Sequence, residues 1–585
     1  MRHRGQPWHT NRRGRRVRQP RVARVALAGH RPLPRARRPR RDPRSTVGHP
    51  RRPVPAQVLR SRRQGDTRRR VGPRTPHRQH QSGRPGTRLE RHPHPRQRIR
   101  ARSLTMNTNQ PTPTGSGPTI SHPVKQRALG AVIGAAVGDA LGAPFEFEPA
   151  GLYPRRFPKP VIGGTGEMIG GGDFHWEPGE FTDDTQMGIA LAESILANGC
   201  YSHDTAWQWF RAWAATASDV GATTRASLRN PDWRRVANHI QRGAGNGALM
   251  RSFPFAVALL HADPDTVKDI VVRHGALTHP DPAAGWGAWI AVELCRHAIH
   301  GKDPFTQMDT LLDRLPTDLR PLFEQLLAAD WTPESEHPSN GSVWGCLAEA
   351  VWAVRTTDTF EDALTAAIAL GHDADTVGCV TGAIAGAIHG IQTIPSRWTT
   401  YINGRIDSPT GPRIYRTADL QRLTTSLLGL NETSDEVLEH AAGPVEVAPR
   451  LYAADLLGAA TVPTDWAVVS LCRTGHRFDG HPVRRQVFLI DQEGDHNPSL
   501  GDAVGDTVRS IDAFLAEGRN VVVHCHGGRS RTGLALKAWK MHASGITERE
   551  AHQWLASRWH RYHDQNRSFV EFLRNDWRPA LRPTS

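Results

Sequence analysis

The sequence predicts a multidomain protein in which a disordered N-terminal tail precedes an all-α domain and then an α/β domain. Three observations lead to this fold class. Arginine and proline dominate the N-terminal segment, apolar residues at helical spacing fill the middle of the chain, and short β-rich runs alternate with helical stretches near the C-terminus. The length of 585 residues is also too great for one ordinary core.

The N-terminal tail, residues 1–121, lacks the apolar content that folding requires. Residues 1–105 hold 33 arginines, no lysine and three acids, a net charge of +30; the whole chain carries +18, so the other 480 residues carry −12. We interpret residues 1–105 as the translation of GC-rich DNA upstream of the true start codon. Met106 would then be the natural N-terminus. The alternative is a basic arm that binds nucleic acid, against which the acidic body argues.

The cysteines and the apolar runs bear on the compartment. The six cysteines show no paired spacing and no CxxC motif, which predicts a reducing environment without a disulfide framework or a zinc knuckle. No uninterrupted apolar run approaches the roughly 20 residues of a membrane span. We therefore expect a cytoplasmic protein without a membrane partner.

The all-α domain is predicted over residues 122–430, where apolar residues recur at spacings of three and four. Two of its segments carry glycine at every fourth position: 130, 134, 138 and 142, and then 378, 382, 386 and 390. Each glycine costs a helix about 1 kcal/mol relative to alanine, so the close approach of another backbone has to compensate. We predict that these two helices pack tightly near the centre of the domain.

The motif FTDDTQM, residues 181–187, places two aspartates between two threonines ahead of an apolar helical pattern. Thr182 is a good N-cap, and Asp183 and Asp184 suit the positive end of the helix dipole. Taken alone, this motif is typical of a capped helix.

The motif GHDADT, residues 371–376, repeats that arrangement with Asp373, Asp375 and Thr376 at another helix start. Glu146 stands just past the end of the first glycine-rich helix. Together the two helix starts and Glu146 form a set of hard oxygen donors, which suits Mg²⁺ or Mn²⁺ and argues against zinc.

Five motifs, in this order, resemble the ADP-ribosylglycohydrolase family: GAVIGAAVGDALGAPFEF, EFTDDTQMGIALAESI, GAGNGALMRSFPFAVAL, THPDPAA and GHDADTVGCVTGAIAGAIHG. The resemblance covers about residues 125–400. It implies an all-helical domain that uses two Mg²⁺ or Mn²⁺ ions to release ADP-ribose from a modified protein or small molecule. It also implies a set of metal ligands, with Glu146 beside the metals: Thr182, Asp183, Asp184, Asp373, Asp375 and Thr376.

The chemistry of the substrate suggests further site residues. Cleavage at the anomeric carbon of ribose passes through an oxocarbenium-like state, and Glu146 is the candidate for general acid and base work. In QRGAGNGALMR, the segment around Asn246 and Gly247 would let backbone N–H groups approach the diphosphate of ADP-ribose, although a plain glycine-rich turn explains it equally well. His279 is a candidate substrate contact, with a purely structural role as the alternative.

The α/β domain is predicted over residues 451–585, after a composition shift at 431–450 that is typical of a linker. The runs DWAVVSLC, QVFLID and NVVVHC are short and β-rich, and helical stretches separate them.

The segment NVVVHCHGGRSRTGLALKAW places Cys525 after a β-run and Arg531 at the start of a helix, with five residues between them. Backbone N–H groups of this loop, which contains Gly527 and Gly528, would wrap a phosphate dianion while Arg531 grips it with a bidentate fork. The same positive field would stabilise a thiolate on Cys525. A buried structural cysteine is the alternative.

The loop and its surroundings resemble the dual-specificity and tyrosine phosphatases. The resemblance implies that Thr532 assists departure of the thiolate and that Asp491 is the general acid, with Asp495 as the fallback. We therefore expect a bifunctional enzyme whose substrates are ADP-ribosylated and phosphorylated proteins or small molecules. In the competing hypothesis, the helical domain only binds ADP-ribose and directs the phosphatase; a third makes the chain a nucleic-acid-binding protein through its tail.

Overall fold

The computed structural model describes residues 120–240, 244–430 and 440–578, which belong to one compact unit, Thr108–Ser585. Below, residues 120–430 are called the helical part and residues 440–578 the sheet part. The predicted tail up to residue 119, the start at Met106 and residues 431–439 of the predicted linker lie outside the described residues.

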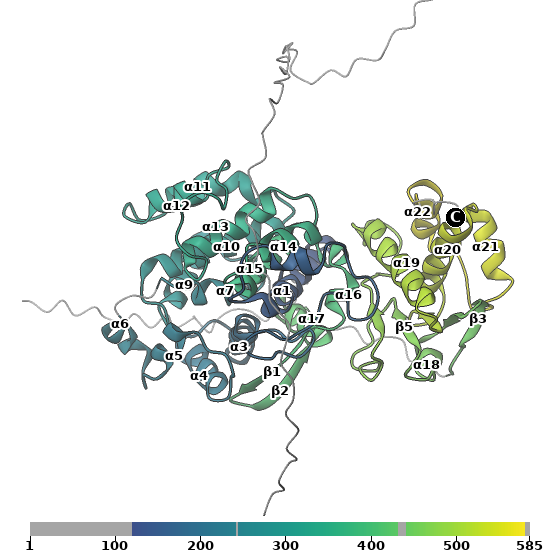
Figure 1. Ribbon diagram of the computed structural model, residues 1–585, viewed down its shortest axis with the longest axis horizontal. Coiled ribbons are helices and arrows are strands. Elements are labelled where there is room, and N and C mark those ends of the chain that lie inside the picture. Colours follow the sequence, from purple (N-terminus) through teal and green to yellow (C-terminus); the bar gives the residue numbers. More distant parts are fainter. Residues whose placement is uncertain (1–119, 241–243, 431–439, 579–585) are drawn as a thin grey trace, which may run out of the picture. The chain divides into compact units, whose positions relative to one another are not determined.

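Helices make up most of the helical part (Figure 1). In chain order they are α1 (His122–Gly142), α2 (Leu152–Arg156), α3 (Asp183–Asn198), α4 (His203–Ala214), α5 (Ala222–Leu228), α6 (Val236–His239), α7 (Gly247–Met250), α8 (Pro254–Ala258), α9 (Pro264–Gly275), α10 (Pro282–Ile299), α11 (Met308–Asp313), α12 (Arg320–Leu326), α13 (Val343–Arg355), α14 (Phe360–Ile368), α15 (Ala374–His389), α16 (Ser396–Thr399) and α17 (Thr417–Leu427). Short 3-10 helices are η1 (Ala143–Phe145), η2 (Trp233–Arg235), η3 (Pro304–Gln307) and η4 (Ile391–Thr393).

The prediction of an all-α domain is wrong in one detail, because an antiparallel hairpin precedes α17. Strand β1 (Asn403–Ser408) pairs with β2 (Gly411–Arg416). The two residues between them form a tight turn that ends at Gly411, whose φ of +108° favours glycine. The strands bury Ile406 and Tyr415 against the helical core, so this hairpin extends the core rather than forming a sheet of its own.

The two glycine-rich helices, α1 and α15, lie antiparallel against each other in the core (Figure 1). A Cβ atom on Gly134 would overlap the carbonyl oxygen of Gly382, and one on Gly138 would overlap that of Gly378. The missing side chains therefore let the two backbones touch, and the burial around this contact offsets the propensity that glycine loses. The prediction of tight packing at the centre is confirmed.

The stretch His122–Phe145 is a candidate membrane span by length and composition, although Asp139 interrupts its apolar run. Its 24 residues are long and apolar enough to cross a membrane, yet its most apolar stretch is fully buried inside the protein. Helices α10, α15 and α17 pack against α1 and cover it. The apolar character of α1 is thus that of a central core helix.

The sheet part holds a five-stranded sheet with the order β3-β4-β7-β5-β6. Its strands are β3 (Val445–Ala448), β4 (Leu451–Ala454), β5 (Ala467–Ser470), β6 (Arg484–Gln486) and β7 (Val521–His524), and its helices are α18 (Leu456–Ala459), α19 (Leu500–Ala516), α20 (Ser530–Ser544), α21 (Glu548–Ala556) and α22 (Arg567–Asn575). Strand β3 runs antiparallel to β4, and the other pairs are parallel. Every residue of β5 and β7 is buried, as central parallel strands require.

Strand β3 lies inside the range 431–450 that composition assigned to a linker. Its backbone pairs with β4, so residues 445–448 form a sheet edge, and the prediction made the linker too long. A short half-exposed strand resembles a linker in composition, which explains the error.

The helical part and the sheet part share a buried polar contact around Arg485, the middle residue of β6. The side chain of Arg485 is 0% exposed. Its guanidinium donates hydrogen bonds to the carbonyl oxygens of Ile162 (2.6 Å) and Gly164 (3.0 Å) and to the Tyr401 hydroxyl (3.1 Å). A buried arginine needs such partners, so this contact fixes β6 against the helical part.

Candidate functional site

The starts of α3 and α15 meet in the helical part and exchange hydrogen bonds. Thr182 is the N-cap of α3, and its hydroxyl accepts from the Asp184 backbone N–H (3.4 Å). The same hydroxyl donates to Asp375 Oδ2 (3.3 Å), while the Thr376 hydroxyl donates to Asp184 Oδ1 (3.3 Å). Each threonine therefore supports an aspartate of the other helix, and the fold brings together two motifs that are distant in sequence.

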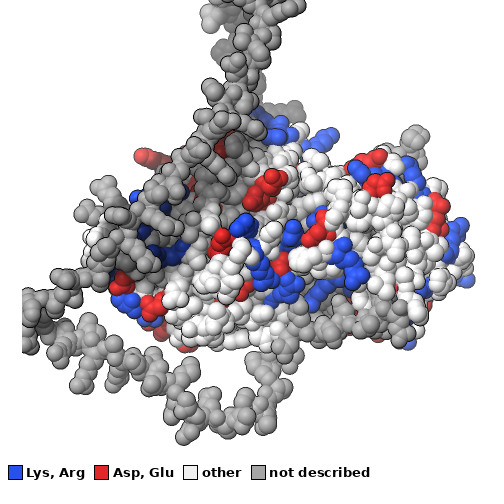
Figure 2. Space-filling model, turned by 90° about the horizontal axis from the view of Figure 1, so that it is seen from below, with Lys and Arg blue, Asp and Glu red and all other residues white. Residues whose placement is uncertain are grey.

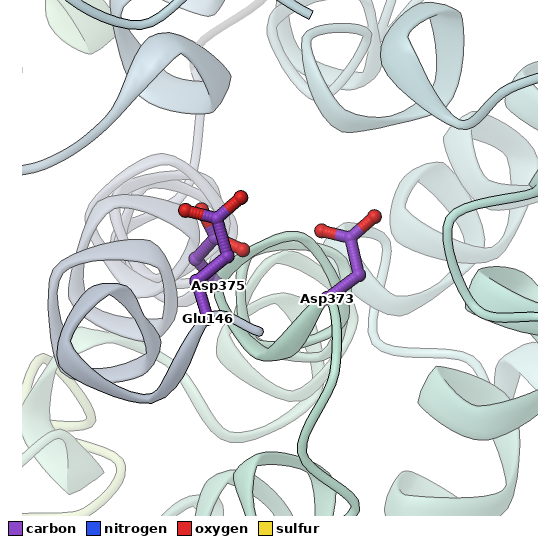
Figure 3. A group of neighbouring side chains, drawn as sticks. All are labelled: Glu146, Asp373 and Asp375. Atoms are coloured by element: carbon purple, nitrogen blue, oxygen red, sulfur yellow. The ribbon is translucent and has the colours of Figure 1, made fainter. Parts of the chain in front are cut away.

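Three carboxylates form the centre of the cluster (Figure 3). One oxygen from each of Glu146, Asp373 and Asp375 lies within 4.8 Å of the others. Figure 3 shows the carboxyl groups of Glu146 and Asp375 close together, with that of Asp373 pointing to the same side. Carboxylates at this spacing repel one another unless protons or cations lie between them.

Backbone hydrogen bonds hold the Glu146 segment against the start of α15. The Phe147 N–H donates to the His372 carbonyl (2.6 Å), and the His372 N–H donates to the Glu148 carbonyl (2.8 Å). Phe147 and His372 both have positive φ angles, 64° and 58°, a conformation that costs non-glycine residues free energy. The reciprocal bonds stabilise this strained pairing and keep Glu146 beside Asp373.

Asp373 differs from Thr182 in its role at a helix start. It stands at the N-cap of α15 without a side-chain capping bond. Its Oδ2 instead accepts a hydrogen bond from the Asn246 side-chain amide (2.8 Å), which also donates to the Asn340 carbonyl (3.0 Å). The Asn246 backbone N–H donates to the Gly341 carbonyl (3.3 Å). Asn246, predicted to approach a diphosphate, therefore holds a carboxylate in the described structure.

His279 packs directly behind the Asn246 segment. Its side chain is 3% exposed, and its Nδ1 pairs with the Thr278 hydroxyl (2.8 Å). A Cβ atom on Gly247 would come within 2.7 Å of the imidazole Cε1, so glycine is needed for this contact. Burial lowers the pKa of His279 to about 3, which keeps the ring neutral. Gly247 and His279 are thus neighbours, and their contact with substrate stays a prediction.

Burial dominates the electrostatics of the cluster. It raises the pKa of Glu146 to about 9, with further increases from Asp219 and Asp373. The pKa values of Asp183, Asp184 and Asp375 are also well above the usual range, first through burial and then through neighbouring carboxylates. Without cations, the cluster therefore retains protons near neutral pH.

Three carboxylate oxygens in this cluster are buried without a hydrogen-bond partner among the residues that the structure describes: Glu146 Oε2, Asp184 Oδ2 and Asp375 Oδ1. Buried polar atoms are almost always satisfied, so these oxygens call for a ligand. Closely spaced anionic oxygens fit a hard divalent cation. The donor set present thus suits Mg²⁺ or Mn²⁺.

Two further acids belong to the site and escaped the sequence reading. Asp139 on α1 is 0% exposed and accepts from the backbone N–H groups of Thr182 (2.9 Å) and Thr185 (3.0 Å), so it anchors the start of α3. Asp219, in the segment between α4 and α5, hydrogen bonds to Asp183. A single acid within an apolar helix indicates a buried hydrogen-bond partner, and this pattern could have identified Asp139 from the sequence. No comparable sequence pattern surrounds Asp219.

Residues 121–436, more than half of the chain, match the family model described as ADP-ribosylglycohydrolase. The chain belongs to the ADP-ribosylglycohydrolase family. It is 30% identical to ADP-ribosyl-[dinitrogen reductase] glycohydrolase of Rhodospirillum rubrum, with 48% of this chain and 92% of the relative covered. It is 31% identical to ADP-ribosylarginine hydrolase Tri1 of Serratia proteamaculans, covering 46% of this chain and 74% of that one.

Among solved structures, an ADP-ribosylglycohydrolase-related protein complex is 31% identical to this chain. The match covers 53% of this chain and 99% of that one, with a TM-score of 0.42. The carboxylate cluster lies wholly inside the range that matches the ADP-ribosylglycohydrolase family.

A second cluster of reactive side chains lies beyond the ADP-ribosylglycohydrolase match, in the sheet part. All six cysteines are free, and Cys525 directly follows β7, at the carboxyl ends of the parallel strands. A cleft of about 360 Å³ is lined by residues that include Cys525, Gly527, Arg531, Asp491 and Glu493. Ligands of open α/β sheets bind at this edge.

Buried donors of the surrounding protein bind carbonyl groups of the loop after Cys525. The Leu456 N–H donates to the His526 carbonyl (3.1 Å), and the Trp559 indole donates to the Gly528 carbonyl (2.6 Å). Gly528 has a φ of +68°, and a Cβ atom there would lie 2.9 Å from the Ala454 carbonyl oxygen. Since an N–H points opposite to the carbonyl of its peptide group, this arrangement favours N–H groups that face the cleft.

Asp491 lies in the cleft and is held by side chains on either side. Its Oδ2 accepts from the Ser530 hydroxyl (2.9 Å), and its Oδ1 accepts from the Asn566 amide (3.2 Å). Arg531 Nε lies 3.5 Å from Asp491 Oδ2, at ion-pair distance but without hydrogen-bond geometry. The fallback residue Asp495 lies on the same loop, yet the acids lining the cleft are Asp491 and Glu493.

Arg531 and Thr532 lie in the first turn of α20, and Arg531 lines the cleft. Arg531 Nη1 donates to the carbonyl oxygens of Leu471 (3.1 Å) and Leu489 (3.3 Å), which follow β5 and β6. The Thr532 hydroxyl is buried and has no hydrogen-bond partner within the described ranges. The carbonyl groups that follow β5 and β6 therefore orient the Arg531 guanidinium, and the Thr532 hydroxyl is available for a hydrogen bond.

Proposed function

We propose that this chain is an ADP-ribosyl hydrolase that releases ADP-ribose from a modified protein or small molecule with two bound Mg²⁺ or Mn²⁺ ions. The observation that carries the proposal is the set of buried, unpartnered oxygens on Glu146, Asp184 and Asp375, in a chain of the ADP-ribosylglycohydrolase family. Cations would satisfy these oxygens and remove the repulsion that keeps their protons bound.

Each residue of the cluster has a role in this proposal. The residues that would hold the ions are Thr182, Asp183, Asp184, Asp373, Asp375 and Thr376. When bound, the ions would supply Lewis-acid chemistry at the oxygens of the ribose and of water. Asn246 orients Asp373 through its amide, and Asp139 orients Thr182 through the backbone.

Glu146 is proposed to move the proton in the hydrolytic step. The bond between the anomeric carbon and the leaving group breaks, and that electron pair leaves with the departing group. The oxygen of water then bonds to the anomeric carbon of an oxocarbenium-like species, and a carboxylate oxygen of Glu146 accepts the proton that water loses. Its unpartnered Oε2 supports this role.

The names of the relatives suggest the first substrate to test. The Serratia relative is called an ADP-ribosylarginine hydrolase, and the Rhodospirillum relative is named for an ADP-ribosylated protein. We propose ADP-ribosylarginine in a protein as the substrate class. Release of free ADP-ribose from such a protein, with and without Mn²⁺, tests this directly. A pure binding module would bind ADP-ribose and release none.

We also propose a second activity, phosphomonoester hydrolysis at Cys525. The supporting observation is the cleft that Cys525 shares with Arg531 and Asp491. The Cys525 thiolate would attack phosphorus, forming the S–P bond as the P–O bond of the ester breaks, and Asp491 would give its proton to the leaving oxygen. Water would then attack phosphorus and lose a proton to Asp491 as the S–P bond breaks, and the Thr532 hydroxyl would donate a hydrogen bond to the departing thiolate.

The phosphatase proposal is tested with p-nitrophenyl phosphate and the full-length protein. We expect turnover that Cys525→Ser eliminates without changing the melting temperature, because an unactivated hydroxyl cannot replace a thiolate. Turnover that persists in Cys525→Ser would remove the cysteine from the mechanism.

A further inference from the structure

The loop that carries Asp491 is closed by one side chain at its base. Asn497 Oδ1 accepts from the Ile490 backbone N–H (2.9 Å), and Asn497 Nδ2 donates to the Ile490 carbonyl (2.9 Å). Both backbone groups of Ile490, the residue just before Asp491, are thus fixed by the Asn497 amide. The position of the Asp491 backbone therefore depends on where Asn497 is held.

Gln392, which belongs to the helical part, holds Asn497. Its Nε2 donates to Asn497 Oδ1 (2.8 Å) and to the Phe488 carbonyl (2.9 Å), and its Oε1 accepts from the Ser499 N–H (3.2 Å). The reverse orientation of this amide would set its oxygen against two acceptors, so the hydrogen-bond pattern fixes the orientation. Gln392 is 5% exposed, which strengthens these bonds and makes their loss costly.

Gln392 lies in η4, which follows α15, and its target loop lies in the sheet part beyond β6. Phe488, next to this contact, packs against the core of the helical part rather than that of the sheet part. The tip of the loop is held separately, since the Gly494 N–H donates to the Ser568 hydroxyl (2.9 Å). The base of the Asp491 loop is therefore attached to the helical part and its tip to α22.

We propose that Gln392 of the ADP-ribosylglycohydrolase domain is a positioning residue for Asp491, so that the phosphatase site of the sheet part is completed by the helical part. This inference rests on the proposed phosphomonoester hydrolysis. A general acid has to reach the leaving oxygen within hydrogen-bond distance. Loss of the Gln392 amide frees Asn497 and Ile490, and Asp491 moves with them.

The test uses two substrates and the full-length protein. p-Nitrophenyl phosphate has a good leaving group that needs little protonation, whereas phenyl phosphate depends on the acid. We expect Gln392→Ala to lower kcat on phenyl phosphate about tenfold or more, since small misplacements of reacting groups have effects of this size, and to lower kcat on p-nitrophenyl phosphate by a clearly smaller factor. In the Asp491→Asn background, Gln392→Ala should change neither rate further.

Asp506→Asn is the matched control. Asp506 Oδ2 accepts a hydrogen bond from the Ser396 backbone N–H (3.0 Å), so this buried contact also joins the helical part to the sheet part. Asp506 lies on α19, outside the Asp491 loop. Parent-like rates on both substrates are expected for Asp506→Asn. If Gln392→Ala does not fold, Gln392→Asn provides the same readout with an amide that is one methylene shorter.

The outcomes separate the two claims. Absence of any Cys525-dependent turnover in the parent protein overturns the phosphatase activity and this inference with it. Parent-like turnover of phenyl phosphate by a folded Gln392 variant overturns the inference alone. So does an equal loss on both substrates, or a further loss in the Asp491→Asn background, because either result assigns Gln392 a general structural role.

Discussion

At the scale of single residues, the candidate metal site is built from acids whose positions are fixed by uncharged neighbours. Thr182 and Thr376 donate to aspartates across two helices, and Asn246 donates to Asp373. These donors orient the carboxylates without neutralising them. The negative charge is thus left for a cation, which distinguishes the cluster from a structural ion-pair network.

The raised pKa values predict how stability depends on pH when ions are removed. Carboxyl groups titrate near pH 4 in the unfolded chain, whereas the folded pKa of Glu146 is about 9 and that of Asp139 about 7. The folded state therefore binds more protons over this range, so the stability that these groups contribute is complete at low pH and is lost as the pH rises to about 9.

The measurement is the melting temperature in a chelator between pH 5 and pH 9. We expect it to fall with pH in the parent and to fall less in Glu146→Gln, which cannot ionise. Added Mn²⁺ should raise the melting temperature most at high pH, because the ions replace protons. A Mn²⁺ effect that does not depend on pH would contradict this interpretation of the cluster.

Arg531 provides the residue-scale prediction for the second site. Arg531→Lys should lower phosphatase kcat about 100-fold or more, because a single ammonium cannot reproduce the planar fork that stabilises charge in the transition state. Steady-state kinetics on p-nitrophenyl phosphate measure the loss. Arg549→Lys, at an exposed position of α21, is the control and should match the parent. Comparable rates in Arg531→Lys and the parent would count against a bidentate phosphate contact.

At the scale of secondary-structure elements, the contact between α1 and α15 determines where the site can form. The same two helices that touch through their glycines carry Glu146 just beyond η1 and Asp375 at the start of α15. Gly142, at the end of α1, has no room for a Cβ because the Ala374 carbonyl and the Asp375 backbone lie against it. Close packing of the backbones therefore brings the carboxylates together.

The glycine contact yields a stability prediction. Gly134→Ala should lower the free energy of unfolding by about 1–3 kcal/mol, because the new methyl group overlaps a carbonyl oxygen and the helices have to separate. Thermal unfolding measures the change. Gly505→Ala in α19 is the matched control: its Cβ would meet only the flexible end of Arg509, at 3.3 Å, and the substitution should be neutral or stabilising by up to about 1 kcal/mol. Equal stability in the two variants would contradict close packing.

The elements also show what the sequence could predict. Glycine spacing identified α1 and α15, and the paired threonine and aspartate motifs identified two helix starts, because local chemistry determines both. The hydrogen bond from Asn246 to Asp373 and the presence of Asp219 depend on chain crossings far apart in sequence. Strand β3 and the β1-β2 hairpin were missed because short, half-exposed strands carry a weak pattern.

At the scale of the whole molecule, the charge distribution bears on the choice of partners. On the face shown in Figure 2, basic and acidic side chains lie beside one another. The residues after 105 carry a net charge of −12, so the nucleic-acid hypothesis depends on the arginine-rich segment, which lies outside the described residues. Buried contacts through Arg485 and Gln392 join the helical and sheet parts, so variants in one part need activity measurements in both.

The most direct measurement of the central claim is the release of ADP-ribose from an ADP-ribosylarginine protein by the metal-stripped, full-length chain, before and after addition of Mn²⁺. We predict release that requires Mn²⁺ in the parent and is abolished in Asp375→Ala, because this carboxylate supplies a buried, unpartnered oxygen to the cluster. The same variant should remain folded and should retain its turnover of p-nitrophenyl phosphate. Release by Asp375→Ala at the parent rate, or release by the parent that does not depend on metal, would contradict the assignment of this cluster as the hydrolytic metal site.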